Sequence, residues 1–402
     1  MAVKTIVGLD IGSTHIRGVE AVNQNDKIQV KGFASITLEP GIVSLGEIRD
    51  AGRLTDALTA LWKKGKFSST DVRVVVNGEN NIASLMSLDE EKDFAQTLPF
   101  KINNTIFNVE EYYIGYHTID IYPQQERDTT SPTGVKTVMK RDILLAGSKK
   151  DTTDLLISAL RNANLRPISI DIAPLAIIRA ESIDDTVEEN GVDVHVNIGA
   201  SMTTIVISHN NQPVYLRSIA DLGGNTITKA IMSRLEVDKD YAEKLKRHTV
   251  NMNPRNRFQS AAPINAPKNL FDDDEEETQQ EAVAAPEPDS ADQLNAYRVV
   301  VEELSGIVNN IQATVEFFAQ SNPSRLGDNI NFIFVSGGTA RFEQIRQRLA
   351  REIGRGNAVL SRPVSILQER GQIGKVSQDI LNDEHEYVLA IGAALAKGEE
   401  QE

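Results

Sequence analysis

The stretch that most constrains how this chain can fold is residues 5–20, an apolar run, a short turn and a second apolar run. Its turn holds Asp10, Gly12, Ser13 and Thr14. A glycine lets the backbone come close to a ligand, and successive turn N–H groups form a concave site for an anion. The two hydroxyls add donors, and the Asp10 carboxylate could hold a hydrated metal ion. The stretch predicts a strand–turn–strand unit that suits a phosphate, although ordinary hairpins also contain these residue types.

Residues 192–207 repeat this layout. The residues that take the places of Asp10, Gly12 and Thr14 are, in order, Asn197, Gly199 and Ser201. Asn197 follows Asp10 by 187 positions in a chain of 402 residues. A unit duplicated at this spacing predicts two related domains that face each other across a nucleotide cleft.

Length and composition agree with two globular domains. A chain of 402 residues can bury two cores, and 40% hydrophobic with 25% charged residues is ordinary for a globular protein. The chain has no cysteine, which excludes disulfides and thiolate metal sites. No apolar run approaches the roughly 18 residues of a membrane span, and the first strand begins too early for a signal peptide. We therefore expect a cytoplasmic protein that does not insert into the membrane.

The net charge of −15 is concentrated in one segment. Residues 269–297 contain ten acidic side chains and neither lysine nor arginine, so the rest of the chain carries only −5. A nearly neutral remainder gives no basic surface, and we expect no binding to nucleic acid.

Apolar periodicity divides the first half of the chain into a domain and an insertion. Residues 1–83 read as three strands, a helix and a further strand, and residues 166–190 return to the same domain. Between them, residues 84–165 form an α+β lobe, with a helix predicted at 90–98. Such a lobe adds nothing obvious to phosphate chemistry, so we interpret it as a partner-binding lobe; the simpler alternative is a wall of the cleft.

The second domain is predicted at residues 191–386, interrupted at 249–292 by a proline-rich acidic segment. That segment cannot bury enough apolar surface to offset its chain entropy, which predicts a disordered loop. Two further glycine turns occur in this domain, at Gly223–Gly224 before a helix and at Gly337–Gly338 after a strand. The first suits an anion, although Gly-Gly-Asn is also ordinary turn chemistry. Residues 387–402 are predicted to form a hinge helix of small residues that packs back on the first domain, with a tail.

The chain resembles the actin-like ATPase superfamily in a set of motifs and in their order. These are the two D-I-G-type turns, Ala242-Glu243-x-x-Lys246, Ser336-Gly337-Gly338-Thr339 and Ala390-x-Gly392-Ala393-Ala394. The ordered set covers nearly the whole chain. The motif Gly-Ile-Val-x-x-Gly-Glu-Ile at 41–48 and the position of the lobe are similar to the PilM and FtsA branch. The resemblance implies an α/β fold: an actin-like, duplicated, ribonuclease-H-like two-domain structure with a nucleotide cleft and an inserted α+β lobe.

The resemblance also implies ATP and Mg²⁺ as cofactors. The residues that it would place around them are Asp10, Gly12, Ser13 and Thr14 (first phosphate turn), Asn197, Gly199 and Ser201 (second phosphate turn), Gly223, Gly224, Asn225, Glu243 and Lys246 (ribose and base), and Gly337, Gly338 and Thr339 (adenosine turn). Asp10 would be the main carboxylate near the metal. Taken alone, the residues at 243–246 favour a solvated helix face over a contact with ribose or adenine.

One departure from the family pattern concerns Asn197, where the family usually has aspartate. An amide supplies no negative charge to organise metal and water, so the sequence favours ATP binding with at most slow hydrolysis and offers no confident catalytic residue. The chain ends in an acidic tail, unlike the amphipathic helix with which FtsA reaches the membrane. This favours the PilM type.

The resemblance to PilM-type proteins implies an adaptor role in the inner-membrane complex of type IV pili. The implied partners are the N-terminal cytoplasmic peptide of a PilN-like membrane protein and other pilus assembly components, which would hold the chain peripherally at the inner face of the membrane. An FtsA-like filament former of cell division is the alternative. A small-molecule kinase on the same fold needs a general base for its substrate, and the sequence offers no convincing one.

Overall fold

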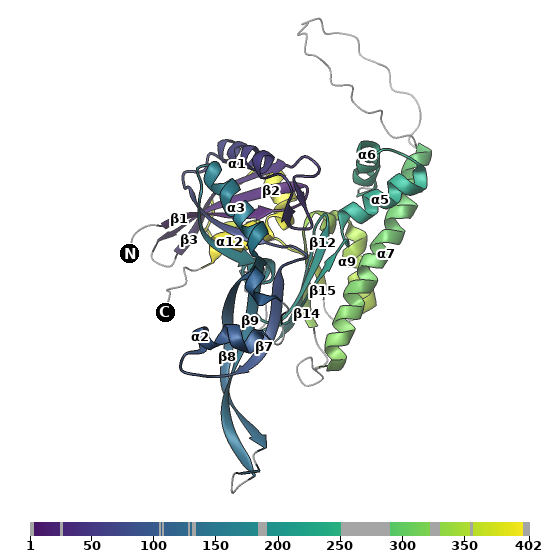
Figure 1. Ribbon diagram of the computed structural model, residues 1–402. Helices are drawn as coiled ribbons and strands as arrows, with labels where there is room; N and C mark the ends of the chain where they lie inside the picture. The colour runs from purple at the N-terminus through teal and green to yellow at the C-terminus, as the bar shows by residue number, and fades with distance from the viewer. Residues whose placement is uncertain are drawn as a thin grey trace, which may run out of the picture.

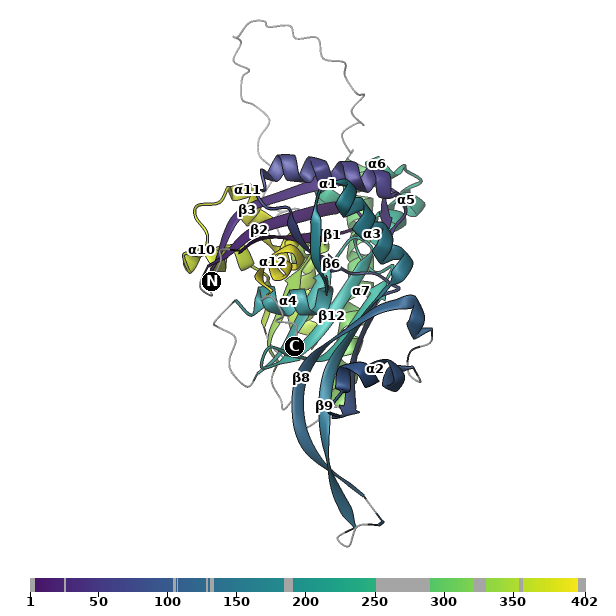
Figure 2. The ribbon, with the colours of Figure 1, turned by 60° about the vertical axis from the view of Figure 1, so that its left-hand side comes forward.

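The computed structural model describes residues 4–24, 27–103, 106, 108–127, 129–130, 134–183, 191–250, 290–321, 330–353 and 357–396. Figures 1 and 2 show two α/β domains side by side, with a smaller lobe projecting from the first. Most of the acidic loop predicted at 249–292 lies outside the described residues, as does the tail after residue 396.

A five-stranded sheet forms the centre of the first domain, in the order β10-β6-β1-β2-β3. The hairpin of β1 and β2 carries the first turn, and β6 runs parallel to β1 and β10. Alternate residues face opposite sides: Leu9, Val72 and Val74 pack against α1, and Val75 faces the other side. The bounds are β1 (Lys4–Ile11), β2 (His15–Gln24), β3 (Lys27–Thr37), α1 (Ala51–Gly65), β6 (Asp71–Val76) and β10 (Arg166–Ile172).

The sheet of the second domain repeats this topology, in the order β13-β12-β11-β14-β15. As in the first sheet, the turn-bearing strand β11 is antiparallel to the next strand and parallel to β14. The strands are β11 (Val192–Ile198), β12 (Met202–His209), β13 (Gln212–Ala220), β14 (Ile330–Ser336) and β15 (Asn357–Leu360). The outer helices are α5 (Gly224–Leu235), α6 (Lys239–Val250), α7 (Ser290–Ser321) and α9 (Glu343–Ile353) (Figure 1). The predicted duplication is therefore present in the fold.

The inserted lobe is a three-stranded antiparallel sheet, β7-β9-β8, covered by α2. Its elements are β7 (Ile82–Asp89), α2 (Phe94–Ile102), β8 (Tyr112–Arg127) and β9 (Val135–Lys149). The helix predicted at 90–98 begins later and continues through Pro99, because Phe94, Leu98 and Ile102 fill one buried stripe.

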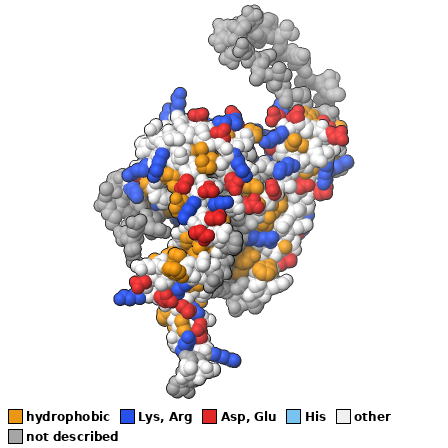
Figure 3. All heavy atoms as spheres, in the orientation of Figure 1, with side chains coloured by type: hydrophobic (Ala, Val, Ile, Leu, Met, Phe, Trp, Pro, Cys, Tyr) orange, Lys and Arg blue, Asp and Glu red, His pale blue; other side chains and the backbone are white. Residues whose placement is uncertain are grey.

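Beyond the end of β7, strands β8 and β9 continue as a two-stranded hairpin that projects from the molecule (Figures 1 and 2). Figure 3 shows hydrophobic and charged side chains intermixed along it. At the base of this hairpin, Lys140 pairs on one face with Asp89 and Glu126. The other face exposes Ile121 and Met139, each 43% accessible.

After the lobe, helix α3 (Lys150–Asn162) packs with α1 on the first sheet, while its first turns also contact lobe strands β8 and β9. Its buried residues Leu156, Ala159 and Leu160 join the same core as Leu54 and Leu58 of α1. The remaining short elements are β4 (Val43–Ser44), β5 (Glu47–Ile48), η1 (Val109–Glu111), η3 (Gly338–Arg341), α10 (Pro363–Glu369), α11 (Gln378–Asn382) and η4 (Glu384–Glu386).

Two helices, α4 (Ala173–Glu181) and α12 (Val388–Leu395), cross each other between the domains. Helix α12 packs on β1, β2 and β6 of the first sheet, and α4 contacts β12 and β13 of the second. The crossing is possible because the backbones touch. A Cβ added at Gly392 would lie 1.9 Å from the Ala176 carbonyl oxygen, and one at Gly8 would lie 2.1 Å from the Ala390 carbonyl oxygen.

We predict that Gly8→Ala lowers the free energy of unfolding by roughly 2–4 kcal/mol, because its methyl group would force β1 and α12 apart. Gly115→Ala is the matched control: Gly115 also lies in a strand, but an added Cβ there meets nothing within 4 Å. Urea unfolding of both variants measures the difference. Equal stability of the two variants would contradict the proposed contact.

Candidate functional site

The two duplicated turns meet across the cleft. The Ser13 and Ser201 hydroxyl oxygens lie 2.6 Å apart, although the residues are far apart in sequence. Each turn closes through the same backbone bond, from the Gly12 amide to the His15 carbonyl and from the Gly199 amide to the Met202 carbonyl, both 2.9 Å. The structure therefore brings the two predicted phosphate turns together.

Three glycine turns converge on the carbonyl oxygen of Gly199. The Gly224 amide donates to it at 3.0 Å, and the Thr339 hydroxyl donates to it at 3.1 Å. A Cβ at Gly223 would lie 2.5 Å from the same oxygen, and one at Gly337 would lie 2.5 Å from the Ile198 carbonyl. Side chains are excluded at these positions, so the backbones of the turns pack directly against one another.

The other predicted residues of this group lie around the same turns. The Asn225 amide donates to the Ala200 carbonyl at 2.7 Å, beside the Gly223–Gly224 turn. A Cβ at Gly338 would lie 3.6 Å from the Glu386 carboxylate, so this turn faces the start of the hinge helix. The Thr14 carbonyl accepts from the Leu38 amide at 2.8 Å, which fixes the first turn to the end of β3.

Helix α6 supplies an ion pair to this region. The Lys246 ammonium donates to the Gly224 carbonyl at 3.1 Å, to the Thr228 hydroxyl at 2.7 Å and to Glu243 at 2.7 Å. Burial lowers the pKa of Lys246, against the opposing effect of Glu243. Both predicted residues thus hold the N-terminus of α5 and border the glycine turns.

Asp10 is 8% exposed and lies on the same hairpin as Arg17, its cross-strand neighbour. Burial raises the pKa of its carboxyl to about 6; Arg17 opposes the rise and Glu386 adds to it. A bound cation stabilises the ionised form of a buried carboxylate by neutralising its charge, and Mg²⁺ prefers oxygen ligands of this kind. Asp10 therefore fits the predicted role of metal carboxylate in its chemistry.

Asn197 lies at the position in the second sheet that Asp10 occupies in the first. Its amide nitrogen donates to the Ser336 hydroxyl at 3.0 Å, which links β11 to the strand that leads into the Gly337 turn. An ionised aspartate could not donate this bond. The amide thus has a structural function of its own in the second sheet.

Three charged residues at the site were not predicted from the sequence. Glu386 bonds very closely to Arg17 of the first domain and accepts from Arg341 of the second at 2.8 Å. Burial would raise the pKa of Glu386, but the two arginines outweigh it and lower the pKa to about 2. The hairpin register places Arg17 opposite Asp10, so it could have been inferred; the approach of Glu386 depends on the tertiary fold alone.

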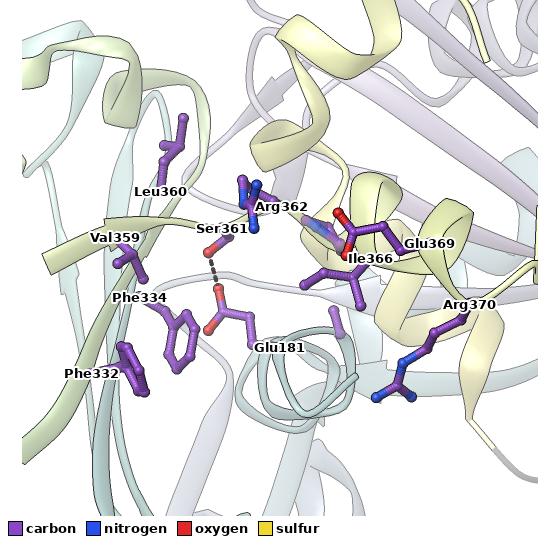
Figure 4. Close-up of a pocket in the computed structure, with 12 residues that line it drawn as sticks. Glu181, Phe332, Phe334, Val359, Leu360, Ser361, Arg362, Ile366, Glu369 and Arg370 are labelled. Atoms are coloured by element: carbon purple, nitrogen blue, oxygen red, sulfur yellow. Dashed lines mark hydrogen bonds between the residues drawn. The ribbon is translucent and has the colours of Figure 1, made fainter. Parts of the chain in front are cut away.

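A cavity of about 460 Å³ lies between α4, β14, β15 and α10, and none of the predicted site residues lines it (Figure 4). In Figure 4, Phe332 and Phe334 form one wall, and the Ser361 hydroxyl bonds to Glu181. Arg362, Glu369 and Arg370 contribute both charge signs to the rest of the lining. The cavity is separate from the nucleotide turns.

Behind this cavity, Ser208, His195 and Glu181 form a chain with the order of a hydrolase triad. The His195 ring nitrogens lie 2.8 Å from the serine hydroxyl and 2.5 Å from the glutamate carboxylate. Ser208 is completely buried and His195 is 2% exposed, so no substrate can reach the hydroxyl. The chain instead fastens α4 to the second sheet.

Asp10→Asn should stabilise the nucleotide-free protein at neutral pH. The folded carboxyl stays protonated up to about pH 6, whereas the unfolded one ionises near 3.8. The free energy of unfolding of the wild type therefore falls by up to about 3 kcal/mol as the pH rises through this window. The variant does not show this fall, because asparagine does not ionise. Urea unfolding at several pH values checks this: the gain should be full above pH 6 and vanish toward pH 4. A gain independent of pH would contradict it.

Comparison with solved structures identifies the architecture. A structure described as the PilM–PilN type IV pilus biogenesis complex matches with a TM-score of 0.71 at 18% identity, over 97% of both chains. The ethanolamine utilization protein EutJ from Carboxydothermus hydrogenoformans matches with a TM-score of 0.51 at 12% identity, over 98% of this chain and 90% of that one. A diol dehydratase-reactivating factor gives the same score at 10% identity, over 98% and 99%. The predicted actin-like two-domain fold is confirmed.

Among the described helices, none combines the length and apolar character needed to cross a membrane. A model of the cell division protein FtsA matches residues 194–392, mostly the second domain. The model described as type IV pilus assembly protein PilM matches residues 8–256, which include the whole inserted lobe and both predicted phosphate turns. Because that match covers more than half of the chain, the chain belongs to the PilM family of type IV pilus assembly proteins.

Proposed function

We propose that this PilM-type protein is a nucleotide-gated adaptor. It binds ATP with Mg²⁺ between its two domains and binds the N-terminal peptide of a PilN-like membrane protein through the inserted lobe. The observation that carries the nucleotide half is the convergence of the glycine turns on the Gly199 carbonyl, opposite the Ser13 hydroxyl. Bare backbone and hydroxyl groups grouped in this way suit a phosphorylated, flat ligand.

Within this proposal, Arg17 binds phosphate oxygens. Its Nε atom is buried and has no hydrogen-bond partner among the described residues, which favours an external acceptor. Asp10 would hold Mg²⁺, which supplies charge neutralisation of the phosphates when bound. Since the second turn carries an amide in place of a carboxylate, holding the nucleotide is favoured over cleaving it.

A contact path supports coupling between the cleft and the lobe. Thr204 follows the second phosphate turn on β12, and its hydroxyl donates to Asn77 of the first domain at 3.3 Å. The next residue, Gly78, packs against Gly46 so closely that a Cβ at Gly46 would lie 2.3 Å from it. The chain enters β7 of the lobe only four residues later. A change of cleft width therefore acts directly on the root of the lobe.

The partner half rests on family membership and on the lobe itself. The similar structure is described as a PilM–PilN complex, which motivates a PilN-like peptide as ligand. Through such a partner, together with other pilus assembly components, a cytoplasmic chain would be held peripherally at the inner face of the membrane.

ATP and the peptide should strengthen each other's binding by the same factor, within the roughly 5–150-fold range typical of coupled sites. The test is calorimetric titration of a synthetic N-terminal PilN peptide with and without Mg-ATP, and the reverse titration. Thr204→Val removes the hydroxyl contact with Asn77 and should reduce the coupling, while each ligand alone binds as before. Thr59→Val, at a hydroxyl that bonds only within helix α1, is the control. Identical peptide affinity with and without ATP would refute the gated adaptor.

A filament-forming role similar to that of FtsA is the second candidate, because the FtsA model matches residues 194–392. The two functions predict different assembly states in the presence of Mg-ATP. An adaptor should remain in the supernatant on high-speed centrifugation, whereas a filament former should sediment. Electron microscopy of the pellet would decide between filaments and amorphous aggregate.

A further inference from the structure

The ion bridge at Glu386 connects both domains to the hinge. Glu386 ends the short helix η4, just before α12, and its side chain is only 10% exposed. It bonds to Arg17 of β2 and to Arg341 of η3, 2.8 Å away. Arg341 also pairs with Asp383 at 2.8 Å, at the exposed rim. One buried carboxylate thus pairs with two arginines, one from each domain.

The bridge lies between the two halves of the proposed nucleotide site. Arg17 is the cross-strand neighbour of Asp10, beside the first phosphate turn. Arg341 ends the helical turn that starts at Gly338, in the predicted adenosine turn, and a Cβ at Gly338 would lie 3.6 Å from the Glu386 carboxylate. Glu386 therefore holds a negative charge where the two nucleotide-facing turns approach each other.

We propose that Glu386 is an internal competitor of the nucleotide phosphates for Arg17. In the nucleotide-free protein its carboxylate occupies the guanidinium, and a bound triphosphate takes its place, leaving Glu386 paired with Arg341 alone. This inference rests on the proposed nucleotide site and adds its regulation. Glu386 is a positioning residue here, because it acts through Arg17 and need not touch the ligand.

The exchange is chemically reasonable for three reasons. A guanidinium has five donors in a planar fork that matches phosphate as well as carboxylate, so either anion can satisfy Arg17. A triphosphate carries more charge than a carboxylate, so its Coulomb attraction to the guanidinium is stronger. Glu386 is not left as an isolated buried charge when it gives up Arg17, because Arg341 remains its partner.

The exchange would also act on the hinge. The Gly337 amide donates to the carbonyl of His385, the residue before Glu386, at 2.9 Å, and α12 begins at Val388. When the carboxylate releases Arg17, the first domain loses this contact with the start of α12. The second domain keeps its contact through Arg341. The phosphates, rather than the nucleoside, would therefore control how tightly the hinge joins the two domains.

The test is Glu386→Gln, which keeps the size of the side chain and removes its charge. By calorimetric titration, Mg-ATP should bind roughly tenfold more tightly than to the wild type, the size of one charge-assisted hydrogen bond. Adenosine should bind with unchanged affinity, because it has no phosphate to compete for Arg17. The control is Asp71→Asn, which breaks an arginine–carboxylate pair with Arg166 outside the cleft and should change neither affinity. A residue that merely stabilised the fold would shift both ligands together.

Each outcome separates this inference from the proposed function. The competition alone would be overturned if the wild type binds ATP but Glu386→Gln binds ATP no more tightly. The same holds if the variant gains as much affinity for adenosine as for ATP. Wild-type protein that binds neither ligand would overturn the nucleotide site and the competition with it. If Glu386→Gln does not fold, Glu386→Asp is the second variant, because it shortens the side chain by one methylene group and so withdraws the charge from Arg17. It should also bind Mg-ATP more tightly than the wild type, by a smaller factor, with no change for adenosine.

Discussion

The structure depends first on the backbone contact between β1, α12 and α4. No side chain separates the crossing elements: Gly8 meets α12, and Gly392 meets Ala176 of α4. Arg179 of α4 adds a bond to the Gly392 carbonyl at 2.6 Å, and Arg73 of β6 donates to the Ala393 carbonyl at 3.2 Å. These contacts fix the crossing of the two helices on the first sheet.

This crossing explains the position of the polar residues that bridge the domains. The serine hydroxyls of the two turns and the arginines around Glu386 connect the domains through polar groups. The buried histidine–glutamate–serine chain connects α4 to the second sheet through groups that no ligand reaches. The inferred exchange at Glu386 would therefore alter the first set of contacts and leave the second unchanged.

The sequence predicted those features that depend on local pattern, and it missed those that depend on long-range approach. The duplicated turns were predictable because each is a hairpin with its own glycine and hydroxyls. Glu386 was not, because nothing in its neighbourhood indicates that it will meet Arg17, 369 positions away. The helix predicted at 90–98 lies at Phe94–Ile102, because a buried apolar stripe sets its position and carries it past Pro99. From the sequence, Asn197 was interpreted only as the replacement of an aspartate usual in the family. In the structure its amide donates a hydrogen bond that an ionised aspartate could not donate.

The projecting β8–β9 hairpin has a mechanical consequence. It belongs to the first domain through the lobe, and its tip is far from the crossing of α4 and α12 (Figures 1 and 2). In a rigid rotation, displacement grows in proportion to distance from the axis, so the hairpin behaves as the long arm of a lever. Its short arm is the first turn, which follows β1 next to the crossing. A small rotation about the crossing is therefore magnified along the hairpin, whose base exposes Ile121 and Met139.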